Sequence, residues 1–273
     1  MKKLIFISAI LFITSSLFAA TVDTATIFSN AMHKKIKCVI IKPNAYKEKN
    51  IRFPVLYLLH GLTDSYAYWV TDIPGIKNEV DKYNMIIVCP DGGFDSWYFD
   101  SPLDTTRKYE THISKEVIQY VDANYRTIND REHRAIAGLS MGGHGAFYIG
   151  LRHTDLFGAV GSTSGVLDIY PLRKYFKIDN LIGDTLNYKN NWQQMSVMNM
   201  IDHYPVNKLA IIIDCGTEDP LYAINKQFHE KLLQLHVLHD YTERPGEHVN
   251  EYWKNAIQYQ LLFFANYFNK MKD

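Results

Sequence analysis

Short apolar runs recur along the chain and predict a series of buried β-strands. Several runs are apolar at nearly every position, which is typical of strands that are covered on both faces of a sheet. The first two predicted strands form a pair joined by a short turn. The predicted strands cover residues 24–29, 35–42, 53–59, 85–89, 135–137, 158–163, 209–214 and 239–243.

Segments in which apolar residues follow a helical spacing separate most of these strands. The predicted helices cover residues 75–83, 109–125, 143–151, 223–235 and 251–269. Alternation of strands and helices predicts the α/β class, with a mostly parallel central sheet and helices on both faces. No repeat or interdomain linker interrupts the pattern, so we expect a single domain over residues 21–273.

Two stretches have no clean period. Residues 95–106 read as a loop rich in aromatic and polar groups, and residues 167–207 are dense in Tyr, Asn, Met and Trp. An insertion of the second kind usually lies over a site, so we expect a small cap there.

The N-terminus has the pattern of a secretory signal. Lys2 and Lys3 precede an apolar run over residues 4–13 and a tail of smaller residues that ends at Ala20. The apolar run is shorter than the about 20 residues that a membrane span requires. We therefore predict a signal peptide over residues 1–20, a secreted or periplasmic location, and no stable membrane insertion.

The composition and charge of the chain limit the kinds of partner and cofactor that we expect. Apolar residues make up 47% of the chain and charged residues 21%, which allows a sizeable core, and the formal net charge is zero. No basic field is present, so we expect no nucleic-acid partner. The three cysteines, Cys38, Cys89 and Cys215, lie in or beside apolar runs and are expected to be buried free thiols. The scattered histidines and the absence of phosphate-binding motifs predict no metal and no cofactor.

The segment around Ser140 has the form of a nucleophile elbow. A short apolar strand leads into Gly138-Leu139-Ser140-Met141-Gly142, and a helical segment follows. This strand–turn–helix setting projects the serine hydroxyl from the sheet, with the helix N-terminus beside it. The five-residue pattern alone is common in unrelated proteins, so the assignment of Ser140 as a nucleophile depends on finding a base and an acid further along the chain.

Acyl transfer by serine requires a base, an acid that orients the base, and donors for the oxyanion. His248 lies between the last strand and the last helix and is the candidate base. Three carboxylates, Asp214, Glu218 and Asp219, follow the preceding strand. The spacing favours Asp219, which lies far enough along the loop to reach a histidine, without excluding the other two.

The oxyanion hole of this arrangement uses two backbone N–H groups. We expect one from Met141, the residue after the nucleophile, and one from Leu62 in the turn after the strand that ends at residue 59. His60 lies at the root of that turn and is expected to support it.

Five blocks of sequence together resemble the esterase D family of α/β hydrolases. The family includes S-formylglutathione hydrolases, tributyrin, feruloyl and acetyl-xylan esterases, and mycolyltransferases. The resemblance implies an α/β-hydrolase fold in which Ser140 is the nucleophile, Asp219 the acid and His248 the base. The blocks are Tyr57–Gly61, Ser96–Tyr98, Gly138–Ala146, Cys215–Asp219 and Gly246–His248.

The substrate is less narrowly defined. A secretory signal argues against a glutathione thioester, whereas secreted relatives often remove acetyl or feruloyl groups from plant polysaccharide. We expect the side chains of His60, Trp97, Tyr98 and Ser164 to line the substrate pocket. The aromatic loop and the cap could hold a sugar or an aromatic acyl group, or could equally be packing.

Three functional hypotheses follow. The first is a secreted serine carboxylesterase acting on short-chain, acetyl or feruloyl esters of a small molecule or an oligosaccharide. The second is an acyltransferase that passes the acyl group to a sugar hydroxyl with the same triad. The third is a catalytically silent carbohydrate-binding protein, whose signature would be the loss of a triad residue.

Overall fold

The predicted sheet is present in the computed structural model, which describes residues 20–205 and 208–271. Eight strands form one open sheet in the order β1-β2-β4-β3-β5-β6-β7-β8. Strands β1, β2 and β4 pair antiparallel, and from β4 to β8 the neighbouring strands are parallel. The strands are β1 Thr21–Ser29, β2 Lys34–Lys42, β3 Val55–Leu59, β4 Ile86–Pro90, β5 Arg134–Leu139, β6 Ala159–Thr163, β7 Ala210–Gly216 and β8 Asp240–Arg244.

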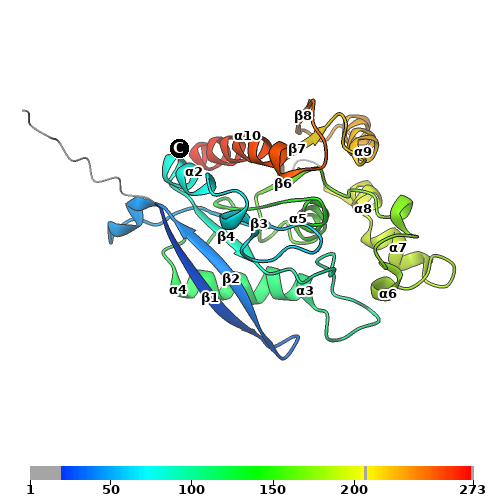
Figure 1. Ribbon diagram of the computed structural model, residues 1–273, viewed down its shortest axis with the longest axis horizontal. Coiled ribbons are helices and arrows are strands. Elements are labelled where there is room, and N and C mark those ends of the chain that lie inside the picture. Colours follow the sequence, from blue (N-terminus) through cyan, green and yellow to red (C-terminus); the bar gives the residue numbers. More distant parts are fainter. Residues whose placement is uncertain (1–19, 206–207, 272–273) are drawn as a thin grey trace, which may run out of the picture.

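Helices cover both faces of this sheet (Figure 1). The helices α4, α5 and α9 pack on one face, and α1, α2 and α10 pack on the other. Three further helices, α6 to α8, lie together beyond the strands β6 and β7. The α-helices are α1 Tyr68–Thr71, α2 Ile76–Tyr83, α3 Tyr109–Thr111, α4 Ile118–Asn124, α5 Met141–Arg152, α6 Asp179–Ile182, α7 Lys189–Met195, α8 Val197–Met200, α9 Tyr222–Gln234 and α10 Asn250–Lys270.

Strand β3 shows why a continuous apolar run forms a central strand. Successive side chains point to opposite faces, so Tyr57 joins one core while Leu56 and Leu58 join the other. All five residues of β3 are buried. A fully apolar run is therefore required here, because neither face of the strand meets water.

The structure refines several sequence-based boundaries. The helix predicted over 109–125 is present but includes a π-helical segment, η2 His112–Val117, between α3 and α4. The helix α1 and the short helices of the cap were not predicted. Single 3₁₀ turns, η1 Asn44–Lys47, η3 Tyr170–Leu172 and η4 Ile201–His203, complete the elements. The three cysteines are buried and free, as expected. The predicted signal lies almost wholly outside the described residues.

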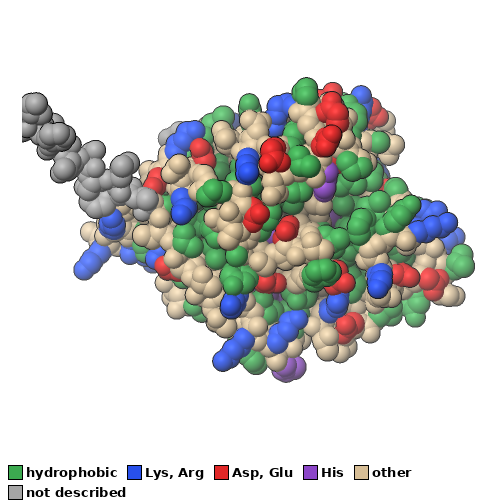
Figure 2. Space-filling model, viewed as in Figure 1, with side chains coloured by type: hydrophobic (Ala, Val, Ile, Leu, Met, Phe, Trp, Pro, Cys, Tyr) green, Lys and Arg blue, Asp and Glu red, His purple; other side chains and the backbone are tan. Residues whose placement is uncertain are grey.

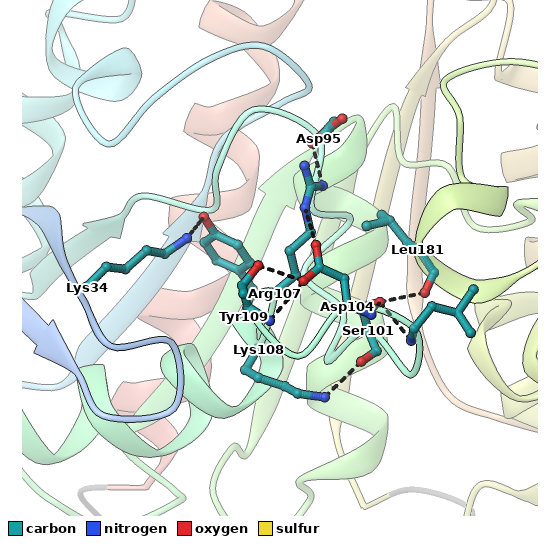
Figure 3. A network of polar contacts seen from close by, with 10 residues as sticks. Lys34, Asp95, Ser101, Asp104, Arg107, Lys108, Tyr109 and Leu181 are labelled. Carbon is teal, nitrogen blue, oxygen red and sulfur yellow. Dashed lines mark hydrogen bonds and ion pairs between the residues drawn. The ribbon is translucent and has the colours of Figure 1, made fainter.

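The loop before α3 is fastened to the cap (Figure 3). The Ser101 hydroxyl donates to the Leu181 carbonyl at 2.7 Å, and Lys108 donates to the Ser101 carbonyl at 2.8 Å. Arg107 binds Asp95 at 2.6 Å within the same loop. The aromatic loop and the cap therefore form one connected wall beside the carboxyl ends of the central strands.

Candidate active site

Ser140 occupies the sharp turn between β5 and α5. Its φ of 54° lies in the region that non-glycine residues rarely adopt, which is the strained backbone expected at a nucleophile elbow. Gly142 cannot carry a side chain, because a Cβ there would lie 2.5 Å from the His60 carbonyl oxygen. A Cβ at Gly138 would lie 2.4 Å from the Gly142 backbone. Close approach of three segments thus fixes the position of the serine.

A chain of two hydrogen bonds joins Ser140, His248 and Asp219. The Oγ atom of Ser140 lies 3.0 Å from Nε2 of His248, and Nδ1 of His248 lies 2.8 Å from Oδ2 of Asp219. The Asp219 side chain is fully buried, while 27% of the His248 side chain is exposed. A buried carboxylate on Nδ1 fixes the imidazole orientation and leaves Nε2 to face the serine.

The two other candidate acids have different partners. Asp214 is buried, accepts a hydrogen bond from the Tyr252 hydroxyl at 2.5 Å and pairs with Arg244 at 2.7 Å. Burial raises the pKa of Asp214, and these two partners oppose that shift. Glu218 accepts a hydrogen bond from the backbone N–H of Gly246. Only Asp219 of the three contacts the histidine, because the turn after β7 directs its side chain toward His248.

The two expected oxyanion donors have free backbone N–H groups. Within residues 20–205 and 208–271, neither the Leu62 N–H nor the Met141 N–H has a hydrogen-bond acceptor. Met141 is the first residue of α5, where an N–H has no intrahelical partner. Gly61, beside Leu62, approaches the serine closely, since a Cβ at Gly61 would lie 3.7 Å from the Ser140 Cβ.

His60 links the turn that carries Leu62 to the loop after β4. Its Nε2 accepts the backbone N–H of Gly92 at 2.8 Å, and its Nδ1 lies 2.8 Å from the Gly61 carbonyl oxygen. These contacts require the neutral imidazole with its proton on Nδ1. Burial lowers the pKa of His60, which favours this form. The ring therefore supports the turn, as the sequence suggested.

The structure corrects the expected substrate pocket. The side chains of His60, Trp97, Tyr98 and Ser164 are each at most 1% exposed, so they do not form an open pocket wall. Tyr98 fills the space above Gly92 and Gly145, and its hydroxyl donates to the His60 carbonyl at 3.0 Å. The contacts of His60 and Tyr98 hold the turn that carries Leu62. Composition identified the aromatic loop but could not show that its rings turn inward.

Trp253 is a neighbour of the histidine that the sequence reasoning missed. Its ring meets the His248 ring edge to face, with centroids 4.9 Å apart. Trp253 lies in the first turn of α10, five residues after His248, so the spacing offered a signal. This contact limits the positions available to the imidazole.

Among the described residues, the side chains form no candidate metal site and the helices form no candidate membrane span. In the part of the chain that the structure describes, no group of three or more His, Cys, Asp or Glu is placed to hold a metal ion. None of the described helices combines the length and apolar character that crossing a bilayer requires. On the face drawn in Figure 2, acidic and basic side chains are interspersed with hydrophobic ones and neither sign forms a continuous field.

Comparisons with known proteins agree with this geometry. The Esterase family model matches residues 29–264. A solved ferulic acid esterase superposes with a TM-score of 0.79 at 32% identity, covering 92% of this chain and 99% of the other. An esterase of Mycobacterium tuberculosis is 28% identical over 239 residues, which are 77% of this chain and 52% of that protein.

A second relative has a different activity in its name. A diacylglycerol acyltransferase/mycolyltransferase of Mycobacterium leprae is 34% identical over 200 residues, covering 66% of this chain and 60% of that protein. The chain thus spans about half to three-fifths of the length of these curated relatives. The family match extends over most of the chain and the fold agrees with the ferulic acid esterase. This chain therefore belongs to the esterase family of α/β hydrolases.

Proposed function

We propose that this protein is an exported serine carboxylesterase whose catalytic residues are Ser140, His248 and Asp219. The observation that supports this most directly is the unbroken chain of hydrogen bonds from the Ser140 hydroxyl through His248 to Asp219. We also propose that residues 1–20 are a signal peptide and that residues 21–273 form the mature single domain.

The reaction proceeds through an acyl-enzyme. His248 Nε2 takes the Ser140 proton while Oγ bonds to the ester carbonyl carbon, and the N–H groups of Leu62 and Met141 stabilise the resulting oxyanion. The imidazolium then gives its proton to the departing alcohol as the ester C–O bond breaks. A water molecule, deprotonated by His248, attacks the acyl-enzyme, and the carboxylic acid leaves as Ser140 regains its proton.

The proposed substrates are short-chain acyl, acetyl or feruloyl esters, including those attached to plant polysaccharide. The similarity to a ferulic acid esterase along nearly the whole chain supports this range.

Substitution of the proposed nucleophile tests the mechanism. Ser140→Ala is expected to lower kcat for 4-nitrophenyl acetate and methyl ferulate by a factor of about 10⁴ or more. Ser114→Ala is the matched control. It removes a serine hydroxyl outside the proposed triad, which donates to the Glu110 carbonyl in the preceding helical turn. If Ser140→Ala retained full activity while correctly folded, the mechanism would be wrong.

Acyl transfer to a sugar hydroxyl is the second candidate function. It uses the same triad, and the similarity to a mycobacterial acyltransferase/mycolyltransferase supports it. Measuring the ratio of transfer to hydrolysis in the presence of added xylose or trehalose distinguishes the two. A third candidate, a catalytically silent carbohydrate-binding protein, predicts that a fluorophosphonate probe does not label Ser140.

A further inference from the structure

The loops that carry the proposed acid and the proposed base run side by side. Strands β7 and β8 are neighbours at one edge of the sheet (Figure 1). The acid loop, residues 217–219, follows β7, and the base loop, residues 245–248, follows β8. A Cβ at Gly216 would overlap the Gly246 carbonyl oxygen, so the two loops approach each other closely beyond the strand ends.

Backbone hydrogen bonds join the two loops. The Thr217 N–H donates to the Arg244 carbonyl at 2.8 Å, and the Glu218 N–H donates to the Gly246 carbonyl at 3.1 Å. These bonds continue the pairing of β7 and β8 past the last residues of both strands. Both of them use carbonyl groups of the later segment as acceptors, so the Gly246 N–H requires an acceptor of its own.

The Glu218 side chain supplies that acceptor. Its Oε2 atom accepts the Gly246 N–H, so residues 218 and 246 exchange two hydrogen bonds. Hydrogen bonds from the Gly246 N–H and the Thr217 hydroxyl lower the pKa of Glu218, which keeps the carboxylate ionised. An ionised acceptor binds an N–H more strongly than a neutral one. The residue directly before the acid therefore holds the residue two positions before the base.

Gly246 has a backbone conformation that the Glu218 carboxylate helps to fix. Its φ is 148°, which glycine adopts more readily than other residues, and glycine loses more conformational freedom on folding than any other residue. His248 follows two positions later, and its Nε2 lies 3.0 Å from the Ser140 Oγ. A misplacement of about 1 Å in a catalytic group can lower a rate by about 10²-fold. The position of Gly246 therefore affects the alignment of the base.

The exposure of Glu218 distinguishes its role from that of Asp219. The Asp219 side chain is fully buried and lies 2.8 Å from the imidazole, whereas Glu218 is exposed and binds the backbone of the base loop. Water and salt screen the charge of an exposed carboxylate. Glu218 therefore acts on His248 through the position of the loop rather than through its charge.

We propose that Glu218 is a positioning residue, which fastens the base loop to the acid loop and so keeps the His248 imidazole aligned for both of its proton transfers. In the first transfer Nε2 takes the Ser140 proton, and in the second it gives this proton to the departing alcohol. Glu218 itself does not contact the substrate. This inference rests on the proposed esterase function and deepens it.

Two acetate esters with different leaving groups test this role. Hydrolysis of either ester requires His248 to take the Ser140 proton. Only ethyl acetate also requires the imidazolium to protonate the departing oxygen, because 4-nitrophenolate leaves as a stable anion. A displaced imidazole should therefore impair hydrolysis of ethyl acetate more than that of 4-nitrophenyl acetate. A lower fraction of folded enzyme would reduce both rates equally.

Glu218→Ala is expected to lower kcat/KM for ethyl acetate by about tenfold to a hundredfold, and that for 4-nitrophenyl acetate by a smaller factor. Glu218→Gln retains a carbonyl oxygen that can accept the Gly246 N–H, so it should recover most of the loss. Glu243→Ala is the matched control and should retain the wild-type rates. Glu243 is an exposed carboxylate on β8 that accepts the hydroxyls of Tyr222 and Tyr241 at 2.8 and 3.1 Å.

All rates are divided by the amount of enzyme whose Ser140 a fluorophosphonate probe labels to completion, and thermal melts verify that these exposed substitutions leave the fold intact. Equal losses on the two esters, or equal rates in Glu218→Ala and Glu243→Ala, would overturn the positioning role. Equal losses in Glu218→Gln and Glu218→Ala would also overturn it, because they would indicate an effect of charge. If wild type hydrolysed neither ester, the esterase proposal itself would be wrong, together with the role that rests on it.

Discussion

The Oδ2 atom of Asp219 lies 2.8 Å from Nδ1 of His248, whereas Asp214, on the adjacent strand end, pairs with Arg244 at 2.7 Å. Two buried aspartates five residues apart thus have separate partners. The Asp219–His248 pair orients the imidazole toward Ser140, and the Asp214–Arg244 pair joins β7 to the end of β8. The two pairs predict different phenotypes for the same Asp-to-Asn change.

Asp219→Asn is expected to lower kcat for 4-nitrophenyl acetate by a factor of about 10⁴, because an amide favours the wrong imidazole tautomer. Asp214→Asn should retain most of the kcat of the folded protein but lower Tm, since it leaves the Arg244 guanidinium without its carboxylate. Steady-state kinetics and thermal melts of both variants provide the comparison. An equal loss of kcat in the two proteins would contradict the assignment.

Gly142→Ala should be strongly destabilising, because its Cβ would lie 2.5 Å from the His60 carbonyl oxygen and neither backbone segment can move freely. Overpacking of this kind costs about 1–3 kcal/mol or more. Gly75→Ala is the control: nothing lies within 4 Å of its added Cβ, so its stability should change by at most about 0.5 kcal/mol. Urea unfolding of both variants measures the difference in their free energies of unfolding. Equal stability of the two variants would show that the elbow is loosely packed and would contradict the prediction.

His60→Ala should lower kcat more than it changes KM. The substitution removes the acceptor for the Gly92 N–H and the contact with the Gly61 carbonyl, both at 2.8 Å, which hold the turn that carries Leu62. His60→Gln, which can restore one of these bonds, should recover part of the loss. If His60→Ala changed only KM, the ring would contact substrate directly and its supporting role would be wrong.

Stability should fall in mild acid through His144. Burial lowers the pKa of His144 to about 4, and its hydrogen bond to the Met195 carbonyl at 3.1 Å opposes this only in part. The unfolded chain binds the proton near its ordinary pKa of about 6.5, so it binds more protons than the folded chain between these values. The free energy of unfolding therefore decreases as pH falls through this window, by an amount on the order of 3 kcal/mol.

The variant His144→Phe isolates this contribution. It keeps a ring against Tyr148 and Phe99, whose centroids lie 5.8 and 5.2 Å from the His144 ring, but it cannot bind a proton. Urea unfolding from about pH 7 to about pH 4.5 should show a shallower decline than in wild type. Hydrogen bonds from three partners lower the pKa of Glu110 to about 2 despite its burial. Protonation of Glu110 therefore reduces the free energy of unfolding only below this pH range. An unchanged slope in His144→Phe would contradict the prediction.

The amino-acid sequence by itself determined the succession of strands and helices, the strand–turn–helix segment around Ser140 and the place of His248 after the last strand. These features depend on residues that are close along the chain: an apolar run forms a central strand, and the glycines beside Ser140 permit a tight turn. The same reasoning located the turn at Leu62, because polar residues directly follow a buried strand.

Only the tertiary structure decided which acid meets His248 and which aromatic rings face solvent. Asp214 and Asp219 both follow the same apolar run, so local sequence does not distinguish their roles. The partners that bind the Asp214 carboxylate, Tyr252 and Arg244, come from later in the chain. Trp97 and Tyr98 were expected in the pocket, yet contacts with α5 and the β4 loop bury them. Side-chain direction depends on packing between distant segments, and local spacing does not specify that packing.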